Sequence, residues 1–377
     1  MSTRRLWAIA RKEFLHVIRD PRSLAMAIAM PLLLMLLYGY ALSLDVDNVP
    51  TVVWDQSESP ASREFISAFN GSRYFSIRAY VRDYREVEEA IDSGRALVAV
   101  IIPRNFAGRL ESGREAAVQL IVDGSDSNTA ALAMGYADVV TLTYAQGVAV
   151  RVVERAGMRP PRPALDFRPR VWFNEDMKSR NYIIPGLIAV IMMVIAALLT
   201  SLTVAREWER GTMEQLISTP VKGPELIMGK LLPYFAIGIF DVLLVVLLGQ
   251  FLFRVPLRGN VVLLFGMAAI FLAGTLSLGI LVSVVTKSQL LASQFSMVLT
   301  FVPSFLLSGF VFAISNMPKP IQWVTYAVPA RYFITVLKSI YLKGVGLEIL
   351  AGQAVLLTVY GTAMVLLANL VFKKKLG

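Results

Sequence analysis

The sequence contains no cysteine, a single histidine and few charged residues, and each shortage removes a class of protein. Without cysteine there can be no disulfide, zinc–thiolate centre or cysteine nucleophile. Only 17% of the 377 residues are charged, whereas 56% are hydrophobic. That balance is too apolar for an ordinary soluble globule and indicates a membrane protein. The single His16 lies in a charged N-terminal stretch, where we interpret it as a surface residue rather than a catalytic one.

Motifs for nucleotide hydrolysis are also missing. The nearest candidate for a phosphate-binding loop is GPELIMGKL, residues 223–231, which has five residues between its glycines where four are needed. Leu231 stands where a Ser or Thr must bind magnesium. The sequence also offers no nucleophile elbow, no zinc pair and no histidine-based acid–base set. We therefore expect no catalytic, cofactor or metal site on this chain, and no enzyme activity of its own.

The net charge of +10 could suggest a nucleic-acid ligand, so its distribution matters. Residues 45–182 hold slightly more acidic than basic residues, and the rest of the sequence carries the whole positive excess. In a membrane protein, Lys and Arg next to the spans set the orientation. A nucleic-acid-binding protein would need a basic face on a soluble domain. The sequence lacks such a face, so we expect no nucleic-acid partner.

Long apolar runs are what the chain does have. A membrane core about 30 Å thick needs roughly 20 apolar residues of helix. The stretches that qualify are 24–44, 183–204, 231–253, 261–285, 289–314 and 349–372. The first is too long for the apolar part of a signal peptide, so we interpret it as an uncleaved helix.

Basic residues at both ends of the chain predict its orientation. Several Arg and Lys residues precede the first run, and Lys373, Lys374 and Lys375 follow the last. Both termini should then face the cytoplasm, which requires an even number of spans. We predict an α-helical polytopic protein of the inner (plasma) membrane with six transmembrane helices. Residues 205–230 should lie in the cytoplasm, and residues 45–182 should form an extracytoplasmic domain inserted between the first two spans.

The inserted domain alternates strand and helix patterns, which is typical of a small α/β domain. We expect strands at 50–55, 75–81, 96–103 and 117–123, helices at 62–70, 84–94 and 128–156, and a last strand at 171–176. A proline-rich linker, 159–169, separates the long helix from that last strand.

Two further segments have a membrane-surface character. Residues 1–22 place Leu6, Ile9, Ala10, Phe14, Val17 and Ile18 at helical spacing, which predicts an amphipathic elbow helix on the inner leaflet, ended by Pro21. Residues 315–348 are rich in aromatics and broken by prolines, which indicates short re-entrant helices at the outer side. Within that region Pro329, Arg331 and Tyr332 are candidates for an outer gate, with interfacial anchoring as the alternative.

The most polar stretch between two spans is REWERGTMEQLISTP, residues 206–220. Helical spacing predicts one charged stripe of Glu207, Arg210 and Glu214. Gly211 should bend the helix and Thr212 should cap a second, short helix. Its apolar side would be Met213, Leu216 and Ile217, and Thr219 with Pro220 would end it. Such a bent helix suits docking into a groove of a cytoplasmic partner.

Polar and small residues inside the spans form a further group of candidates. Asp241 lies in the middle of the third span, where a carboxylate is costly. It is either a substrate or proton site or a structural hydrogen-bonding residue, with Gln250 as one possible partner. Gly274 and Gly279, with Ser277 and Ser283 nearby, predict close helix packing in the fourth span.

These segments together resemble one family. REWERGTMEQLISTP is similar to the coupling segment of the ABC-2 type permeases, which are the membrane subunits of one class of ABC exporters. KEFLHVIRDPRSL with MPLLLMLLYGYAL resembles their elbow and first span, and IVDGSDSNTA resembles a turn in the outer domain of the drug-efflux-like branch. PSFLLSGFVFAISNMPKPIQWVTYAVPARYFI resembles their fifth span and re-entrant region, although Ala313 stands where the family often has proline. The resemblance covers essentially the whole chain.

The resemblance implies a motor on another chain. ATP and magnesium would bind to a separate ATPase subunit, and two permease chains, identical or different, would work with two ATPases. The elbow and the coupling segment would rest on the ATPases. The positions that match the family's coupling motif are Glu207, Arg210, Gly211, Thr212, Glu214, Leu216, Thr219 and Pro220.

The implied function is ATP-driven export of an amphipathic or lipid-like compound, with drugs the most plausible class and a periplasmic adaptor as a further partner. Two other functions stay open from the residues alone. One is an ATP-independent transporter that moves protons or cations with Asp241, and the other is a non-transporting membrane sensor whose outer domain binds a ligand.

Overall fold

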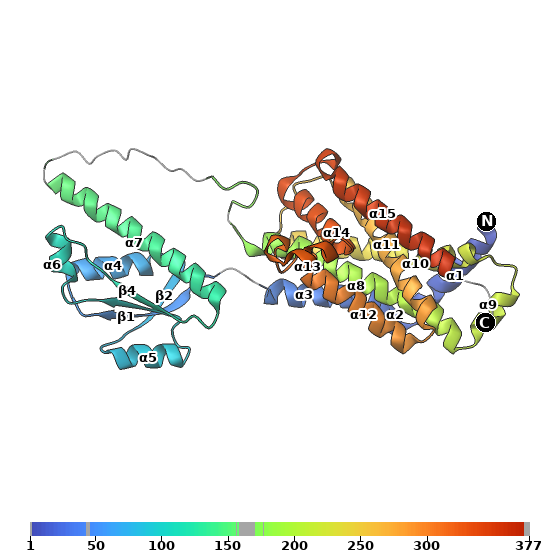
Figure 1. Cartoon of the computed structure of the whole chain (residues 1–377), viewed down its shortest axis with the longest axis horizontal. Helices are drawn as coiled ribbons and strands as arrows, with labels where there is room; N and C mark the ends of the chain where they lie inside the picture. The colour runs from blue at the N-terminus through green and yellow to red at the C-terminus, as the bar shows by residue number, and fades with distance from the viewer. Residues whose placement is uncertain (1, 43–45, 156, 158–169, 176, 373–377) are drawn as a thin grey trace. The chain divides into compact units, whose positions relative to one another are not determined.

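The computed structural model describes residues 2–42, 46–155, 157, 170–175 and 177–372, and the chain divides into two compact units. One unit comprises Met1–Ser43 with Arg170–Gly377, and the other comprises Leu44–Pro169. We call them the helical unit and the sheet unit and describe each by itself. Figure 1 shows packed helices in the first and a small sheet with helices in the second.

The helical unit follows from long apolar stretches separated by short polar turns. Its elements in chain order are α1 (Thr3–Arg19), α2 (Pro21–Leu24), the π-helical turn η1 (Ala25–Ala29), α3 (Met30–Ala41), α8 (Ser179–Glu209), α9 (Thr212–Ser218), α10 (Gly223–Leu247), the π-helical turn η2 (Leu248–Leu252), α11 (Val261–Thr286), α12 (Gln289–Leu306), the 3-10 turn η3 (Ile314–Asn316), α13 (Lys319–Thr325), α14 (Pro329–Lys338), the π-helical turn η4 (Ser339–Lys343) and α15 (Leu347–Val371).

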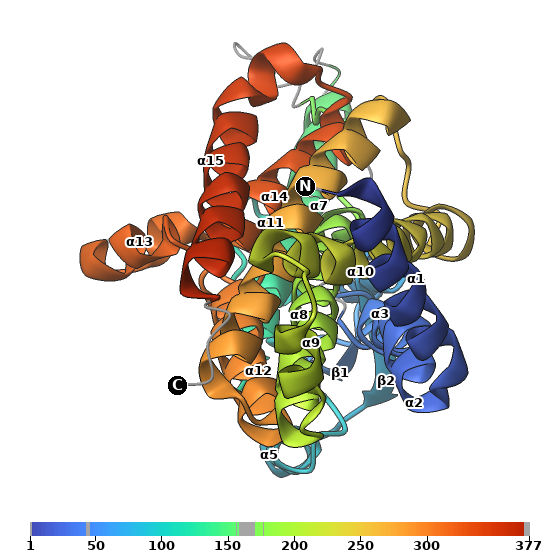
Figure 2. The same cartoon turned by 90° about the vertical axis from the view of Figure 1, so that its right-hand side faces the viewer.

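Five helices in the described part of the chain are long and apolar enough to cross a membrane: α8, α10 with η2, α11, α12 and α15. The protein is thus a polytopic helical membrane protein. Helix α8 is apolar on all sides, and 94% of its most apolar 18-residue window is buried, against 17% for α15. A helix that is hydrophobic all round belongs in the centre of a bundle. Accordingly α8 packs against α3, α10, α11, α12 and α14 (Figure 2).

The first predicted span is the shortest apolar helix. The stretch expected at 24–44 forms the apolar helix Ala25–Ala41, and residues 43–45 lie outside the described residues. Seventeen residues are at the lower limit of what crosses a membrane core. The total of six spans therefore stays a prediction.

Two other boundaries differ from the sequence prediction. Helix α10 begins at Gly223, well before the predicted residue 231, because the Glu225 carboxylate accepts a hydrogen bond from the Lys222 amide at 3.0 Å and caps its first turn. Helix α12 ends at Leu306 rather than near residue 314, and Gly309 follows with a φ of +80°. A left-handed glycine turns the chain away from the helix axis. Residues 315–348 contain the short helices α13 and α14, as the proline pattern predicted.

Small residues let α11 approach its neighbours closely, which confirms the packing expected for Gly274 and Gly279. A Cβ on Gly279 would collide with the Thr200 hydroxyl and the Ala197 carbonyl of α8, and one on Gly274 would collide with the Gly361 backbone of α15. The Ser283 hydroxyl accepts hydrogen bonds from two α8 amides, at 3.0 and 2.8 Å. The Thr200 hydroxyl donates back to the Leu276 carbonyl at 2.9 Å. Side-chain-to-backbone bonds thus join the two helices where small residues permit contact.

The sheet unit is a four-stranded sheet with the order β2-β1-β3-β4. Strand β1 pairs in parallel with β2 and β3, and β3 pairs antiparallel with β4. Its elements are β1 (Val49–Asp55), α4 (Pro60–Asn70), β2 (Phe75–Tyr80), α5 (Tyr84–Asp92), β3 (Val98–Ile102), α6 (Phe106–Glu111), β4 (Gln119–Val122) and α7 (Ser127–Arg155). Helix α6 is an element that the sequence reasoning missed.

Both faces of this sheet are covered, which explains why the central strand VAVII is buried throughout. Val49 and Val53 of β1 pack with α4 and α7 on one face, whereas Val52 packs with Val87 of α5 on the other. Figure 1 shows α5 across the sheet from α4 and α7.

At the start of α7 the Thr129 hydroxyl donates to Asp126 at 2.5 Å, and this bond lowers the pKa of the Asp126 carboxyl.

The strand predicted at 171–176 is wrong. Phe173 has a φ of +73°, which a strand does not allow, and the Asn174 side-chain amide donates to the Lys178 carbonyl at 3.0 Å. Asn181, in the first turn of α8, donates to the Asn174 side chain at 2.8 Å. The segment therefore folds locally at the start of α8, and no neighbouring strand offers it a partner within the described residues.

We expect the helix contact at Gly279 to be the most sensitive glycine position of α11. Gly279→Ala should lower the unfolding temperature of the purified chain, because overpacking at a close contact costs about 1–3 kcal/mol. The control is Gly266→Ala in the same helix, where a Cβ would meet nothing within 4 Å. That variant should be neutral or stabilising by about 0.5–1 kcal/mol. Equal unfolding temperatures for the two variants would contradict the proposed contact.

Candidate functional site

The polar stretch 206–220 has a bent shape, but the bend is made differently from the prediction. Helix α8 ends at Glu209, Gly211 adopts a left-handed φ of +70°, and α9 begins at Thr212. Gly211 therefore occupies the N-cap position that we assigned to Thr212. The Thr212 hydroxyl instead donates a hydrogen bond back to the Glu207 carboxylate. Glycine suits this position because a left-handed conformation costs other residues about 1–2 kcal/mol.

The predicted charged stripe is also divided by this bend. Glu207 turns inward, with only 12% of its side chain exposed, whereas Arg210 and Glu214 are exposed. Glu207 belongs to α8, Arg210 follows its end and Glu214 belongs to α9, so the spacing expected of a continuous helix does not apply. The interpretation of a single stripe was wrong for this reason.

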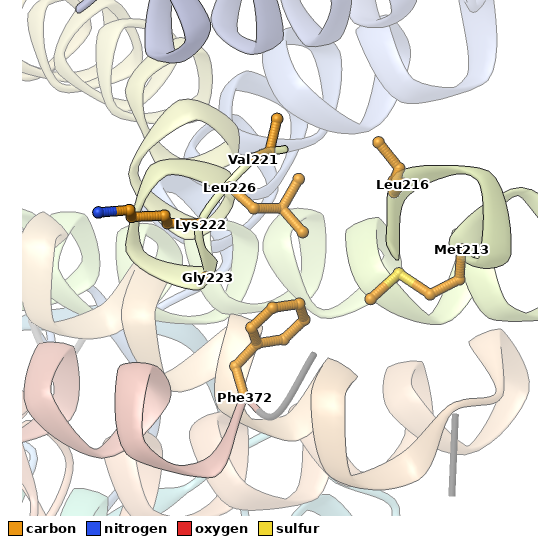
Figure 3. A pocket seen from close by; sticks show the side chains of 7 residues that line it. All are labelled: Met213, Leu216, Val221, Lys222, Gly223, Leu226 and Phe372. Atoms are coloured by element: carbon orange, nitrogen blue, oxygen red, sulfur yellow. The ribbon is translucent and has the colours of Figure 1, made fainter. Parts of the chain in front are cut away.

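The apolar side of α9 faces its own chain. Met213 is buried and Leu216 packs against the same core. Figure 3 shows Met213, Leu226 and Phe372 around one small pocket, which α9 lines together with the start of α10 and the residue that follows α15. The side chain of Ile217 lies outside the described ones. Met213 and Leu216 of the apolar knob predicted for docking are therefore occupied within the helical unit, and the exposed side chains that the structure describes on α9 are polar.

A buried cation joins the three elements around this segment. Lys230 of α10 has only 2% of its side chain exposed, and its ammonium donates to Glu13 of α1 at 2.5 Å and to Glu207 of α8 at 3.3 Å. The exposed Lys12 adds a bond to Glu207 at 2.9 Å. A buried ammonium is tolerated only if carboxylates satisfy it, so these residues hold α1, α8 and α10 together. We call Lys230, Glu13, Glu207 and Lys12 the lysine cluster.

A second polar group extends the lysine cluster along α1. The Arg206 guanidinium lies 2.7 Å from Nε2 of His16 and 3.9 Å from the Asp20 carboxylate. His16 is partly exposed, and its ring contacts Arg206. Between the two groups is a polar cavity of about 170 Å³, whose lining includes Glu13, His16, Arg206, Glu207 and Thr212.

The beginning of α1 is fastened to the end of residues 206–220, the predicted coupling segment, which we call the coupling stretch. Arg5 donates to the Pro220 carbonyl at 2.5 Å, and the Ser2 amide donates to Glu225 at 2.7 Å. The Thr219 hydroxyl donates to the Leu216 carbonyl at 2.6 Å and ends α9. The sequence therefore predicted the bend after α8 but not the contacts that α1 makes with its far end.

Sequence reasoning missed Glu13, Lys12 and Lys230, although one signal was available. Glu13 lies four residues from both Ile9 and Val17, on the apolar face of the elbow helix. An acidic residue on such a face is expected to have a buried cationic partner. No local pattern could name that partner, because Lys230 is 217 positions away.

The intramembrane candidates do not pair with each other. Asp241 is buried, and its Oδ1 atom has no hydrogen-bond partner in the part of the chain that the structure describes. Gln250 is exposed in the π-helical turn η2. The hydrogen bond between them that we considered is not found within the described residues, because Asp241 faces the interior of the protein and Gln250 is exposed.

The three candidates for an outer gate lie at the junction of α13 and α14. Pro329 opens α14, the Arg331 guanidinium lies 3.9 Å over the ring of Tyr326, and the Tyr332 hydroxyl donates to the Tyr326 carbonyl at 2.6 Å. Arg331 also donates to the Thr325 hydroxyl. These contacts fasten the two short helices together. A gating role stays a prediction.

Comparison with known proteins adds independent information. The family model described as "ABC-2 family transporter protein" matches residues 21–370. The probable multidrug ABC transporter permease YbhS of Escherichia coli K12 is 39% identical over 91% of this chain and 90% of its own. YbhR, the probable multidrug ABC transporter permease of the same strain, is 30% identical over 92% of both chains. The inner membrane transport permease YhhJ is 25% identical over 87% of this chain and 86% of its own.

The apolar helices, the bent segment after α8 and the match over nearly the whole length lead to one conclusion. The chain belongs to the ABC-2 family of transporter permeases and is a multi-pass inner-membrane protein.

Proposed function

We propose that this chain is the permease subunit of an ABC-2 exporter that is driven by ATP hydrolysis on a separate ATPase subunit. It would cross the membrane six times, with both termini in the cytoplasm and the sheet unit outside. Two permease chains would form the pathway, as the family implies. The absence of a phosphate-binding loop from the sequence agrees with a motor on another chain.

The observation that carries this proposal is the lysine cluster. A push on the exposed side of α9 reaches Glu207 through the short turn at Gly211 and reaches α10 through Met213 and Leu226. Because Lys230 binds Glu207 and Glu13 together, the end of α8, the elbow and α10 respond as one body. Coupling is reciprocal, so substrate binding in the membrane must alter ATPase closure by the same free energy.

The described side chains on the surface offered to the ATPase are polar. Arg210, Glu214, Gln215 and Ser218 are exposed around the bend and on α9. Charged groups at an interface give orientation and specificity more than affinity, so this surface suits a partner that must stay in register while it moves. A periplasmic adaptor for the sheet unit is an additional expectation from the family resemblance.

An apolar groove supports an amphipathic or lipid-like substrate, with drugs as the most plausible class. It has a volume of about 250 Å³, lies between the first apolar helix, α8 and α12, and is lined only by Met, Leu, Val, Ile, Tyr and Phe side chains. Aromatic residues Phe301 and Phe305 line the α12 side. Such a lining binds apolar surface without selecting a particular polar group. The relatives YbhS and YbhR are named as probable multidrug permeases, in agreement with this class.

Lys230→Met should destabilise the permease strongly. It leaves Glu13 buried without its cation and Glu207 with only Lys12, and an unpaired buried charge costs about 3–5 kcal/mol. Replacing both partners, in Lys230→Met with Glu13→Leu, should recover much of that loss. The matched control is Lys12→Met, because Lys12 is 55% exposed and its ion pair contributes at most about 1 kcal/mol. Thermal unfolding in detergent measures all three, and a Lys230 variant as mild as the Lys12 variant would disprove the cluster's role.

Glu214→Lys should uncouple the permease from its ATPase without unfolding it. Glu214 is exposed and lies in the first turn of α9, so charge reversal changes the docking surface and not the core. Substrate-stimulated ATP hydrolysis in the reconstituted complex should fall by about 5–150-fold, the range of typical coupling energies. Glu111→Lys, on an exposed carboxylate of the sheet unit, should have no effect. Full stimulation in the Glu214 variant would refute the assignment of this surface.

Gly211→Pro should also uncouple the permease from its ATPase, since proline cannot adopt the φ of Gly211.

Asp241 distinguishes this function from a second candidate. Its buried carboxylate without a partner on Oδ1 favours a proton- or cation-coupled transporter as the alternative. If ATP drives transport, Asp241→Asn should keep most activity, because the amide preserves the shape of the side chain. Transport by the permease alone under a proton gradient, abolished in Asp241→Asn, would instead establish the alternative. The measurement is substrate uptake into vesicles with and without ATPase and gradient.

A further inference from the structure

Helix α1 has two different flanks. The flank with Arg5, Lys12 and His16 binds the coupling stretch and the end of α8. On the other flank, Arg4, Trp7, Arg11, Phe14 and Ile18 follow one another at intervals of three and four residues, so they share one helix face. All five side chains are exposed, including 63% of Trp7 and 44% of Phe14. An exposed aromatic and apolar stripe requires a partner or a lipid surface.

This second flank forms one wall of a groove of about 480 Å³. Trp7, Ala10, Arg11 and Phe14 line it from α1, and Leu232, Pro233 and Ala236 line it from α10. The groove is a fixed feature of the fold, because α1 packs directly against α10. A Cβ on Gly229 would lie 2.8 Å from Ile9, and Lys230 binds Glu13 just beside it. The concave shape therefore does not depend on a loop.

The α10 wall continues into a membrane-facing surface. Leu232 and Ala236 are followed along the same helix face by Phe240, Leu243 and Leu247, all exposed. They belong to a helix long and apolar enough to cross the membrane. Acyl chains that cover this stripe in the bilayer therefore extend without interruption into the groove.

The α1 wall supplies the charge. Neither the Arg4 nor the Arg11 side chain has an ion pair or hydrogen bond within the described residues, whereas Arg5 and Lys12 on the other flank are engaged. Arg11 lies four residues after Trp7 and three before Phe14, so its guanidinium stands at the rim of an aromatic, apolar groove. Trp at the interface level, with Arg reaching the headgroups, is the usual arrangement for binding a lipid surface.

We propose that the groove between α1 and α10 is a binding site for an anionic phospholipid of the inner leaflet. The acyl chain lies along Leu232 and Ala236, Trp7 and Phe14 cover it, and Arg11 with Arg4 binds the phosphate and the anionic headgroup. Because the opposite flank of α1 grips the coupling stretch, such a lipid holds the elbow in the position from which it supports α9. The site rests on the cytoplasmic placement of the elbow in the proposed function, but not on ATP coupling.

The test uses the whole permease alone, without ATPase, in lipid nanodiscs of phosphatidylcholine. Phosphatidylglycerol with brominated acyl chains is titrated in, and fluorescence quenching of Trp7 is obtained as the difference between the native chain and Trp7→Phe. Brominated phosphatidylcholine at the same mole fractions reports contact without headgroup charge. We expect phosphatidylglycerol to quench Trp7 at lower mole fractions than phosphatidylcholine.

The variants separate headgroup binding from acyl-chain contact. Arg11→Gln should weaken phosphatidylglycerol binding about fivefold, the effect of one basic side chain at an anionic surface, and leave phosphatidylcholine unchanged. Arg4→Gln with Arg11→Gln should weaken it about 25-fold if the two act independently. Ala236→Trp should fill the groove and reduce quenching by both lipids. Arg85→Gln, on an exposed residue of α5, is the matched control and should change nothing.

Three results would overturn the proposal. The first is equal quenching by the two lipids in the native chain, and the second is an Arg11 variant that binds phosphatidylglycerol like the Arg85 control. The third is loss of Trp7 quenching when the ATPase subunit is added, because a protein would then cover the groove. Since the first two measurements involve no ATPase, failure of ATP coupling in other experiments would not affect them.

Discussion

The arrangement of the helical unit depends on one ammonium group that has almost no contact with water. Lys230 lies between Glu13 and Glu207, and the cost of removing these charges from water is recovered only while all three stay together. Apolar packing alone would let α1 slide along α10, since such contacts have no direction. A buried ion pair permits few positions, so it fixes the elbow and the end of α8 in one register. Because Gly229 has no side chain, Ile9 of α1 packs close against α10, and the ion pair can form in that register.

Fixing these elements divides the surfaces of the coupling stretch. The apolar residues Met213 and Leu216 turn inward against α10 and α15, and the charged residues Arg210 and Glu214 stay outside. The elbow is divided in the same way, with one flank on the coupling stretch and the other on an open apolar groove. Each of the two helices therefore has one side committed to the permease and one side free for another molecule. In the proposed function, α9 and the elbow pass motion from the ATPase to the permease, and such a role requires this division.

Much of the fold follows from local pattern. Apolar length predicts the spans α8, α10, α11 and α15, because a helix in lipid must satisfy its own backbone and expose only apolar side chains. The strands of the sheet unit follow from short β-branched runs between turn residues. The failures have local causes too: 171–176 looks like a strand, but Phe173 with positive φ and the bonds of Asn174 to Lys178 and Asn181 make it a turn.

The bend at residues 206–220 was determined by the sequence, since Gly211, the charges around it and the closing Thr219 and Pro220 stand in one short run. Its orientation was decided only by the tertiary structure. Whether Glu207 pointed outward or inward depended on a lysine in another helix and on a glutamate 217 positions from that lysine. Local propensity acts over a few residues, whereas the desolvation of a charge depends on everything that surrounds it in space, and no spacing along a chain contains that information.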